Sequence, residues 1–162
     1  MIEISRRRVV QMLGAGTLGV LAADMLDVAS AEADGLGKMR IPKLHVAKTI
    51  YHGTSNQVLN RGGFGLWVGS AAPGHVGHSI VFGHRTSAGG PLRRLNSLRP
   101  GDLVIAGGKT YTVRKTEIIS GTDVTRALSY GAGGMRLSII TCTKHDGTPT
   151  STRYRLVVRA SV

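Results

Sequence analysis

Cys142 is the only cysteine in the chain and the first residue to consider for covalent chemistry. It ends the mainly apolar segment 136–142, and the polar segment 143–151 follows. Side chains alternate along a strand, so Cys142 would share one face with Ser138 and Ile140, at the rim of the strand. Binding and catalytic groups gather where rigid elements open into loops. A lone thiol excludes an internal disulfide, an all-cysteine zinc site and a cysteine-ligated iron–sulfur cluster, which leaves an inert buried residue or a nucleophile.

A reactive thiol needs a proton donor for the leaving group, and histidine is the usual one. The chain has six histidines: His45, His52, His75, His78, His84 and His145. His84 stands out because it follows the apolar run 78–82 and Gly83, which places it at a strand end as well. The alternative for any single histidine is a surface or hydrogen-bonded structural residue. His75 and His78 flank Gly77 in a loop without an acidic neighbour, so we do not expect them to bind a metal.

Residues 153–159 offer a cation for the same site. If 135–142 and 153–158 pair as a hairpin with a long loop, Arg153 or Arg155 reaches the thiol. A guanidinium there would stabilise a developing oxyanion or hold a substrate carbonyl. Arg155 directly precedes the apolar run Leu156–Val158 and is expected on the strand, whereas Arg153 equally suits the strand surface.

The elements that position these residues are short. Glycine is frequent, at 23 residues, and only 4% of residues are aromatic, which favours many turns and a β fold over a helical bundle. Residues 62–77 are expected to form a loop, with a turn at Pro73-Gly74. We expect a mainly all-β fold of about eight strands: a mostly antiparallel closed barrel with a few short helices. The clearest strands are 78–82, 103–105, 109–119, 135–142 and 154–158, and the short helices are 54–60, 91–98 and 123–129.

The N-terminal residues resemble an export leader. Arg6, Arg7 and Arg8 precede an apolar run of about 15 residues, shorter than the roughly 20 of a membrane span. The paired arginines also resemble a twin-arginine signal. Cleavage and retention of the leader stay open, and an ordinary N-terminal helix is the alternative. The expected organisation is a leader at 1–31, a polar linker at 32–40 and one catalytic domain at 41–162.

The formal net charge is +12, from 21 Lys and Arg against 9 Asp and Glu. We do not expect a nucleic-acid partner, because few aromatic residues are available for stacking and no helix-turn-helix or zinc-finger spacing occurs. An exported protein would instead meet anionic wall polymers or lipid headgroups at a wall or membrane surface. A surface charge that only solubilises the protein is the alternative.

Four motifs are the most specific part of the sequence: Gly83-His84-Arg85-Thr86, Leu98-Arg-Pro-Gly-Asp102, Ser138-Ile-Ile-Thr-Cys142 and Arg155-Leu-Val-Val158. Together they resemble the sortases, cysteine transpeptidases of the Gram-positive envelope, over about residues 40–160. The resemblance implies an eight-stranded sortase-type closed β-barrel. It implies that Cys142 is the nucleophile, His84 the general acid/base and Arg155 the residue that positions substrate and stabilises the oxyanion. It further suggests substrate contacts by Thr141 and Arg153, and no cofactor or metal.

The segment 83–92 is most similar to class E sortases, which are common in actinobacteria. That class is associated with sorting signals of the Leu-Ala-x-Thr-Gly type rather than Leu-Pro-x-Thr-Gly. Ser87-Ala88 and Thr143-Lys144 depart from class E, where an aromatic residue and His-Pro are frequent, so class F stays open. The calcium-binding acidic cluster of some class A members has no evident counterpart.

The resemblance implies an exported enzyme on the extracellular face of the cell membrane. Cys142 would attack the Thr carbonyl of a sorting signal in a secreted protein, and an amine such as a peptidoglycan cross-bridge or lipid II would resolve the thioacyl enzyme. An L,D-transpeptidase-like enzyme is disfavoured because its Ser-x-Gly-Cys-x-Arg pattern is absent. A papain-like hydrolase would have to use His145, the only histidine after Cys142. A non-catalytic basic barrel that binds an anionic wall polymer is the third alternative.

Overall fold

The computed structural model describes residues 35–162. The expected leader, residues 1–31, lies outside these described residues. Within the described part, no helix combines the length and apolar character needed to cross a membrane.

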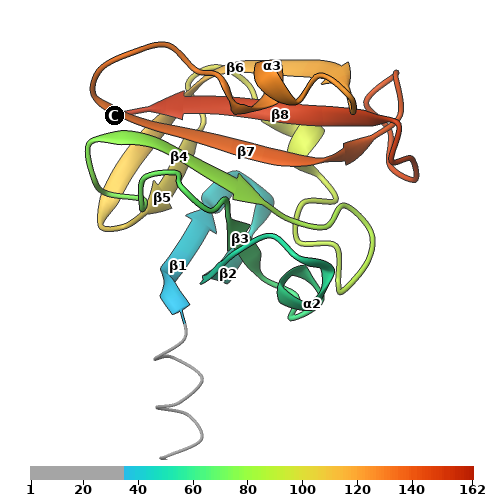
Figure 1. Ribbon diagram of the computed structural model, residues 1–162, viewed down its shortest axis with the longest axis horizontal. Helices are drawn as coiled ribbons and strands as arrows, with labels where there is room; N and C mark the ends of the chain where they lie inside the picture. The colour runs from blue at the N-terminus through green and yellow to red at the C-terminus, as the bar shows by residue number, and fades with distance from the viewer. Residues whose placement is uncertain (1–34) are drawn as a thin grey trace, which may run out of the picture. The chain divides into compact units, whose positions relative to one another are not determined.

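Eight strands close into a barrel in the order β1-β2-β3-β4-β7-β8-β6-β5 (Figure 1). Six of the eight pairings are antiparallel, while β2 with β3 and β4 with β7 are parallel. The expected eight-stranded, mostly antiparallel closed barrel is therefore confirmed. The strands are β1 (Gly35–Ile41), β2 (Val46–His52), β3 (Phe64–Leu66), β4 (Gly77–Phe82), β5 (Leu103–Ala106), β6 (Lys109–Ser120), β7 (Met135–Thr143) and β8 (Tyr154–Ser161).

Short helices join the strands: η1 (Pro42–Leu44), α2 (Asn56–Leu59), η2 (Leu95–Ser97) and α3 (Val124–Leu128). The helices α2 and α3 begin where side-chain acceptors satisfy an otherwise free backbone N–H. Ser55 accepts from the Val58 amide at 3.3 Å, and Asp123 accepts from the Arg126 amide at 3.1 Å. Both helices fall inside the predicted segments, 54–60 and 123–129.

Two groups of apolar side chains lie on opposite faces of the barrel wall. The larger group fills the interior, with fully buried side chains such as Met39, Phe64, Tyr111, Leu137, Ile139 and Val158. The smaller group lies on the outside of the strands β4, β7, β8 and β6, and comprises Ile80, Ile140, Val157, Ile119 and Ala127. Since Ala127 belongs to α3, this helix covers part of the outer face (Figure 1).

Two segments differ from the sequence-based expectation. The predicted linker, 32–40, overlaps β1, in which Met39 and Ile41 are fully buried while Lys38 and Arg40 are exposed. This period-two pattern spans only four residues and follows two glycines, so its signal is weak. The predicted loop 62–77 contains the three-residue strand β3, which is wholly buried and too short to show any alternation.

Candidate active site

Cys142 and Arg155 are direct neighbours across the antiparallel pair β7 and β8. Opposed residues on one face of such a pair have Cβ atoms about 5 Å apart. The long-looped hairpin expected from the sequence therefore forms, and it selects Arg155 as the arginine beside the thiol. Both side chains are half-buried, so the thiol is reachable from outside the barrel.

His84 reaches the same place from the other side of β7. The strands β4 and β7 run parallel with Phe82 beside Ile140, and the Gly83 amide then donates to the Ile140 carbonyl at 3.2 Å. Continuing this register by two residues puts His84 beside Cys142. His84 follows the end of β4 by two residues, Cys142 lies on β7 and Arg155 on β8, and we call these three candidate residues the catalytic set.

The His84 ring is held by Asn60, the residue that ends α2. Its Nε2 lies 2.9 Å from Asn60 Oδ1. Because an amide oxygen accepts, Nε2 donates in this contact, and Nδ1 has no hydrogen-bond partner within residues 35–162. Asn60 escaped the sequence analysis, since a residue 24 positions away at the end of a short helix shows no spacing pattern with His84.

Arg155 leaves most of its guanidinium available. Its Nη1 donates to the Thr152 carbonyl at 2.5 Å and to the Tyr154 carbonyl at 3.1 Å, whereas its Nε and Nη2 make no hydrogen bond within residues 35–162. Gly121 makes room for this fork: a Cβ atom there would lie 3.1 Å from Arg155 Nη1 and 2.8 Å from the Arg153 carbonyl. An anchored guanidinium with free donors suits a substrate carbonyl or oxyanion.

Thr141 lies differently from what we expected. Its side chain is 2% exposed, and its Oγ1 donates to the Gly83 carbonyl at 2.7 Å. Alternation along β7 explains the difference, because Thr141 must face away from Cys142. This buried contact ties the residue before the nucleophile to the residue before His84, so Thr141 has no access to a substrate on the outer face.

Arg153 and His145 lie at the periphery of the site. Arg153 is exposed and precedes β8, so it does not share the strand position of Arg155. His145 is exposed in the β7–β8 loop, with its ring edge-on to Tyr154 at a centroid distance of 5.4 Å. Neither side chain belongs to the paired part of β7 and β8.

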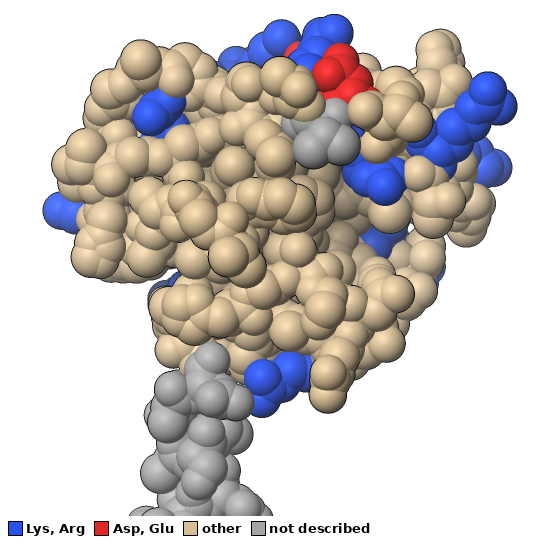
Figure 2. All heavy atoms as spheres, in the orientation of Figure 1, with Lys and Arg blue, Asp and Glu red and all other residues tan. Residues whose placement is uncertain are grey.

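Basic side chains gather near the end of the hairpin β7–β8. In Figure 2, Lys and Arg side chains lie mainly around the edge of the face shown, and several gather on its right-hand side, where the β7–β8 loop lies in Figure 1. The described residues contain no group of three or more His, Cys, Asp or Glu side chains placed to hold a metal ion. A thiol, an imidazole and a guanidinium in this arrangement can supply a nucleophile, a proton donor and a cation.

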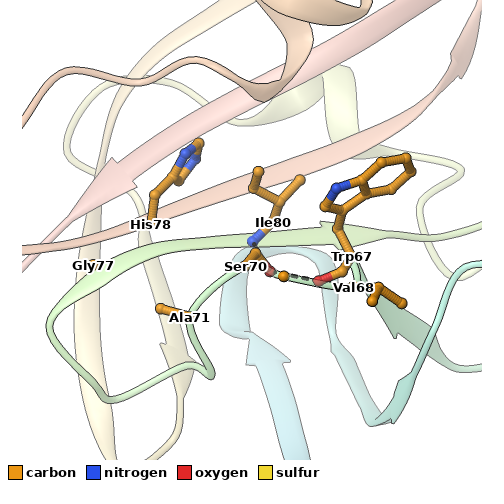
Figure 3. Close-up of a pocket in the computed structure, with 8 residues that line it drawn as sticks. Trp67, Val68, Ser70, Ala71, Gly77, His78 and Ile80 are labelled. Carbon is orange, nitrogen blue, oxygen red and sulfur yellow. Dashed lines mark hydrogen bonds between the residues drawn. The ribbon is translucent and has the colours of Figure 1, made fainter.

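An open hollow of about 430 Å³ lies at the other end of β4. It is bounded by Trp67, Val68 and Ser70 on the β3–β4 connection, and by His78 and Ile80 on β4 (Figure 3). Alternation along β4 gives Ile80 the same face as His84. The apolar outer face thus runs from this hollow toward the catalytic set.

A second group of a histidine, a hydroxyl-bearing residue and an arginine lies on β4, β7 and β8, farther from the rim than the catalytic set. His78 Nε2 lies 2.7 Å from Ser138 Oγ, and Arg159 Nη1 donates to that oxygen at 3.1 Å. Arg159 Nε donates to Glu117 Oε1 at 2.9 Å. Ser138 and Arg159 are 0% and 4% exposed. We call His78, Ser138, Arg159 and Glu117 the buried cluster.

Three cations surround the Glu117 carboxylate in the buried cluster. Burial disfavours its charged form, but hydrogen bonds from Arg159, Lys115 and Arg126 outweigh this and lower its pKa from 4.5 to about 2. Arg159 also donates through Nη2 to the Arg126 carbonyl at 2.5 Å. The cluster thereby fastens α3 to the outer face of the barrel.

His78 is held neutral in the buried cluster. Burial lowers its pKa to about 4, and the positive charges of Arg136 and Arg159 add to this effect, against a backbone hydrogen bond at Leu128 that raises it. Its ring also meets Tyr130 edge-on, at a centroid distance of 5.7 Å. A half-buried histidine that stays neutral at neutral pH and bonds a buried hydroxyl group is typical of a structural residue.

The closed mixed barrel, with a thiol, an imidazole and a guanidinium on the outer ends of β7, β4 and β8, is a sortase-type barrel. The family model described as "Sortase domain" matches residues 39–162. The chain therefore belongs to the sortase family, as the four sequence motifs predicted.

Individual relatives agree with this assignment. Sortase SrtE1 of Streptomyces coelicolor is 28% identical over 141 residues, which is 76% of this chain and 39% of that protein. The crystal structure of sortase E1 from Streptomyces coelicolor with a tripeptide in the active site matches 79% of this chain and 87% of that one, with a TM-score of 0.69 and 26% identity. The SrtA sortase from Actinomyces oris shares the fold, with a TM-score of 0.70, 21% identity and coverage of 78% of each chain. The chain thus spans about two fifths of the curated relative's length.

Proposed function

We propose that the chain is a cysteine transpeptidase that cleaves a sorting signal between Thr and Gly and transfers the Thr acyl group to an amine. One observation carries the proposal: Cys142 on β7 pairs with Arg155 on β8, and His84 follows the end of β4, the strand that pairs with the other side of β7. Buried structural groups satisfy one another, whereas no hydrogen bond joins these three side chains within the described residues. Membership of the sortase family supports the same activity.

The reaction follows from the roles of the three groups. The Cys142 thiolate forms a bond to the Thr carbonyl carbon, and the carbonyl oxygen becomes an oxyanion that the free donors of Arg155 stabilise. The Thr–Gly bond then breaks, and protonated His84 gives a proton to the departing Gly amine. An incoming amine attacks the thioester, gives its proton to His84 and releases the Cys142 thiolate.

The substrate in this proposal is an exported protein with a C-terminal sorting signal, and the acceptor is an amine of the cell wall or of its lipid-linked precursor. The enzyme then acts at the extracellular face of the cell membrane. The basic groups of the described residues, 18 Lys and Arg against 4 Asp and Glu, suit an anionic envelope surface.

The direct test is mass spectrometry of the full chain after mixing with peptides that contain Leu-Ala-x-Thr-Gly or Leu-Pro-x-Thr-Gly. We expect a thioacyl adduct on Cys142 with one or both peptides, and its transfer to triglycine on addition of that amine. Absence of any adduct with both peptides, under conditions where iodoacetamide labels Cys142, would contradict the proposed reaction.

Two histidine variants test the proton donor. His84→Ala should form the adduct at least about 100-fold more slowly, because general acid catalysis typically supplies 10²–10⁴ in rate. His145→Ala is the matched control, since His145 is the histidine that lies close in sequence to Cys142. A slow His145→Ala beside a normal His84→Ala would reverse the assignment.

A further inference from the structure

Arg85 directly follows His84 and is one of two arginines that are almost completely buried among residues 35–162, at 3% exposed. Its Nε donates to the Arg93 carbonyl at 2.8 Å, and its Nη2 donates to Asn96 Oδ1 at 3.0 Å and to the Gly147 carbonyl at 2.9 Å. The other buried arginine, Arg159, has a carboxylate partner. Arg85 forms no salt bridge with any of the described residues, and its partners are neutral oxygens.

The position is therefore costly for a cation. Burial alone lowers the pKa of Arg85, which means that its charged form is destabilised there. In addition, its buried Nη1 has no hydrogen-bond partner within residues 35–162. An ion buried without a counter-charge loses several kcal/mol of solvation that neutral acceptors replace only in part. An apolar side chain would avoid this loss, so stability alone does not account for an arginine here.

The contacts of Arg85 join two loops that flank the catalytic set. The first loop leaves β4 after His84 and folds back, so that the Leu92 amide donates to the His84 carbonyl at 3.2 Å. Arg85 holds this loop through the Arg93 carbonyl. The second loop is the β7–β8 loop, residues 144–153, which begins shortly after Cys142 and ends shortly before Arg155. Arg85 holds it through the Gly147 carbonyl.

The two ends of the β7–β8 loop are fixed by other bonds: Thr143 Oγ1 on β7 donates to the Thr148 carbonyl at 3.1 Å, and the Gly121 amide donates to the Arg153 carbonyl at 2.8 Å. Inside the loop, the Lys144 amide donates to the Thr148 carbonyl at 2.9 Å, and the Gly147 amide donates to the Lys144 carbonyl at 3.1 Å. These two bonds shape the turn itself, and none of the four bonds joins it to the loop that follows His84. The hydrogen bond from Arg85 to Gly147 crosses 62 residues of sequence and attaches the turn to the segment that carries His84.

We infer that Arg85 is a positioning residue for the transpeptidase reaction proposed above. Its guanidinium fixes the β7–β8 loop against the His84 loop, and thereby holds the thiol and Arg155 in register with the proton donor. Arg85 itself touches no substrate. The inference concerns turnover and rests on the proposed function, but it also makes a claim about loop order that needs no substrate.

Hydrogen exchange on the full chain tests the loop. In Arg85→Met, we expect the amides of residues 144–152 to exchange at least about 10-fold faster, while those of β1 and β2 are unchanged. Arg85→Lys should behave similarly, because one ammonium cannot reach three acceptors placed for a planar fork. Arg94→Met is the matched control: it removes an exposed arginine of the same connection and should leave the β7–β8 loop unchanged.

Steady-state kinetics with a sorting-signal peptide test the consequence for catalysis. Misplacement of reacting groups by about 1 Å can cost on the order of 100-fold in rate. We therefore expect kcat of Arg85→Lys to fall about 10- to 100-fold while KM stays within about 3-fold. Asn96→Ala removes one acceptor from an exposed side chain and should reproduce the effect more weakly, even if the Arg85 variants fold poorly.

Two results would overturn the inference. One is a β7–β8 loop that exchanges at the parental rate in Arg85→Lys and Asn96→Ala. The other is faster exchange spread evenly over all strands, with kcat per folded molecule unchanged, which would make Arg85 a general stabilising residue. If Arg85 orders this loop in the unsubstituted protein but that protein cleaves no sorting-signal peptide, the proposed function is refuted, while the role of Arg85 in ordering the loop is supported.

Discussion

The catalytic set and three members of the buried cluster, His78, Ser138 and Arg159, are built around the same strands, β4, β7 and β8. Cys142 and Arg155 lie at the rim and His84 just beyond the end of β4, whereas His78, Ser138 and Arg159 lie farther along these strands. In the buried cluster the three side chains bond to one another, and Glu117 neutralises the arginine. In the catalytic set, the His84 ring and the Arg155 guanidinium each bond to residues outside the set and not to each other.

This difference distinguishes a structural group from a reactive group on the same face of the sheet. His84 is fixed by Asn60, and Arg155 by its own backbone neighbours, so their reactive atoms stay free for a ligand. When two side chains bond to each other, as Ser138 and Arg159 do, their donors and acceptors are already used and are not available for a reaction. A His–nucleophile–Arg pattern therefore indicates an active site only where its members are exposed and not bonded to each other.

The largest expected difference in activity and stability is that between the variants Cys142→Ala and Ser138→Ala. Cys142→Ala should lose at least about 10⁴-fold in acyl transfer, since removal of a nucleophile eliminates the covalent route. Its free energy of unfolding should stay within about 0.5 kcal/mol of the parent. Ser138→Ala should keep its activity per folded molecule but lose about 1–3 kcal/mol, because it leaves buried polar partners unsatisfied. Single-turnover assays and urea unfolding measure the two quantities, and the reverse pattern would invalidate the distinction.

Arg159→Met should have the next largest effect, and on stability alone. It leaves the Glu117 carboxylate buried beside fewer cations, which typically costs about 3–5 kcal/mol. In the parent, the depressed pKa of Glu117 stabilises the fold fully above about pH 4.5, and this contribution is lost as the pH falls toward 2. Urea unfolding between pH 3 and 7 should show this acid dependence in the parent and a weaker one in Arg159→Met.

Arg155→Lys should lower the rate of Cys142 acylation by about 10²–10³-fold, the usual loss for one oxyanion donor. The charge is kept, but an ammonium cannot present the planar fork of donors. Arg153→Lys is the control and should change the rate only a few-fold, because Arg153 lies outside β8. A crippled Arg153→Lys beside an almost normal Arg155→Lys would show that the loop arginine is the catalytic one.

The smallest expected effect is a pH dependence due to His78. Its pKa is about 4 in the folded protein and near 6.5 in the unfolded chain. The unfolded state therefore binds a proton first, so stability is complete above about pH 6.5 and declines as the pH falls to 4. His78→Asn should flatten this part of the stability profile without altering the pH dependence of catalysis, which urea midpoints and acylation rates at matched pH values would check.

Much of the molecule was predictable because its signals are local. The strand that ends near Cys142, the strand that ends before His84 and the two short helices α2 and α3 are each indicated by residues within the segment itself. The parts that were missed depend on contacts between distant segments: Asn60 with His84, and Glu117 with Arg159. Thr141 shows the same limit on a smaller scale. Its hydrogen bond to the Gly83 carbonyl is evident only once β7 is placed beside the segment that follows β4.

The parallel pairing of β4 with β7 has a consequence for folding kinetics. Parallel neighbours require a crossover, and here the intervening chain includes β5, β6 and α3. Contacts of such sequence separation form late, because loop closure must precede them. His84 and Cys142 therefore meet only once β7 has docked on β4, and until then the chain carries an isolated thiol and an isolated imidazole. Recovery of acyl transfer during refolding thus reports the step in which β7 pairs with β4 and closes the barrel.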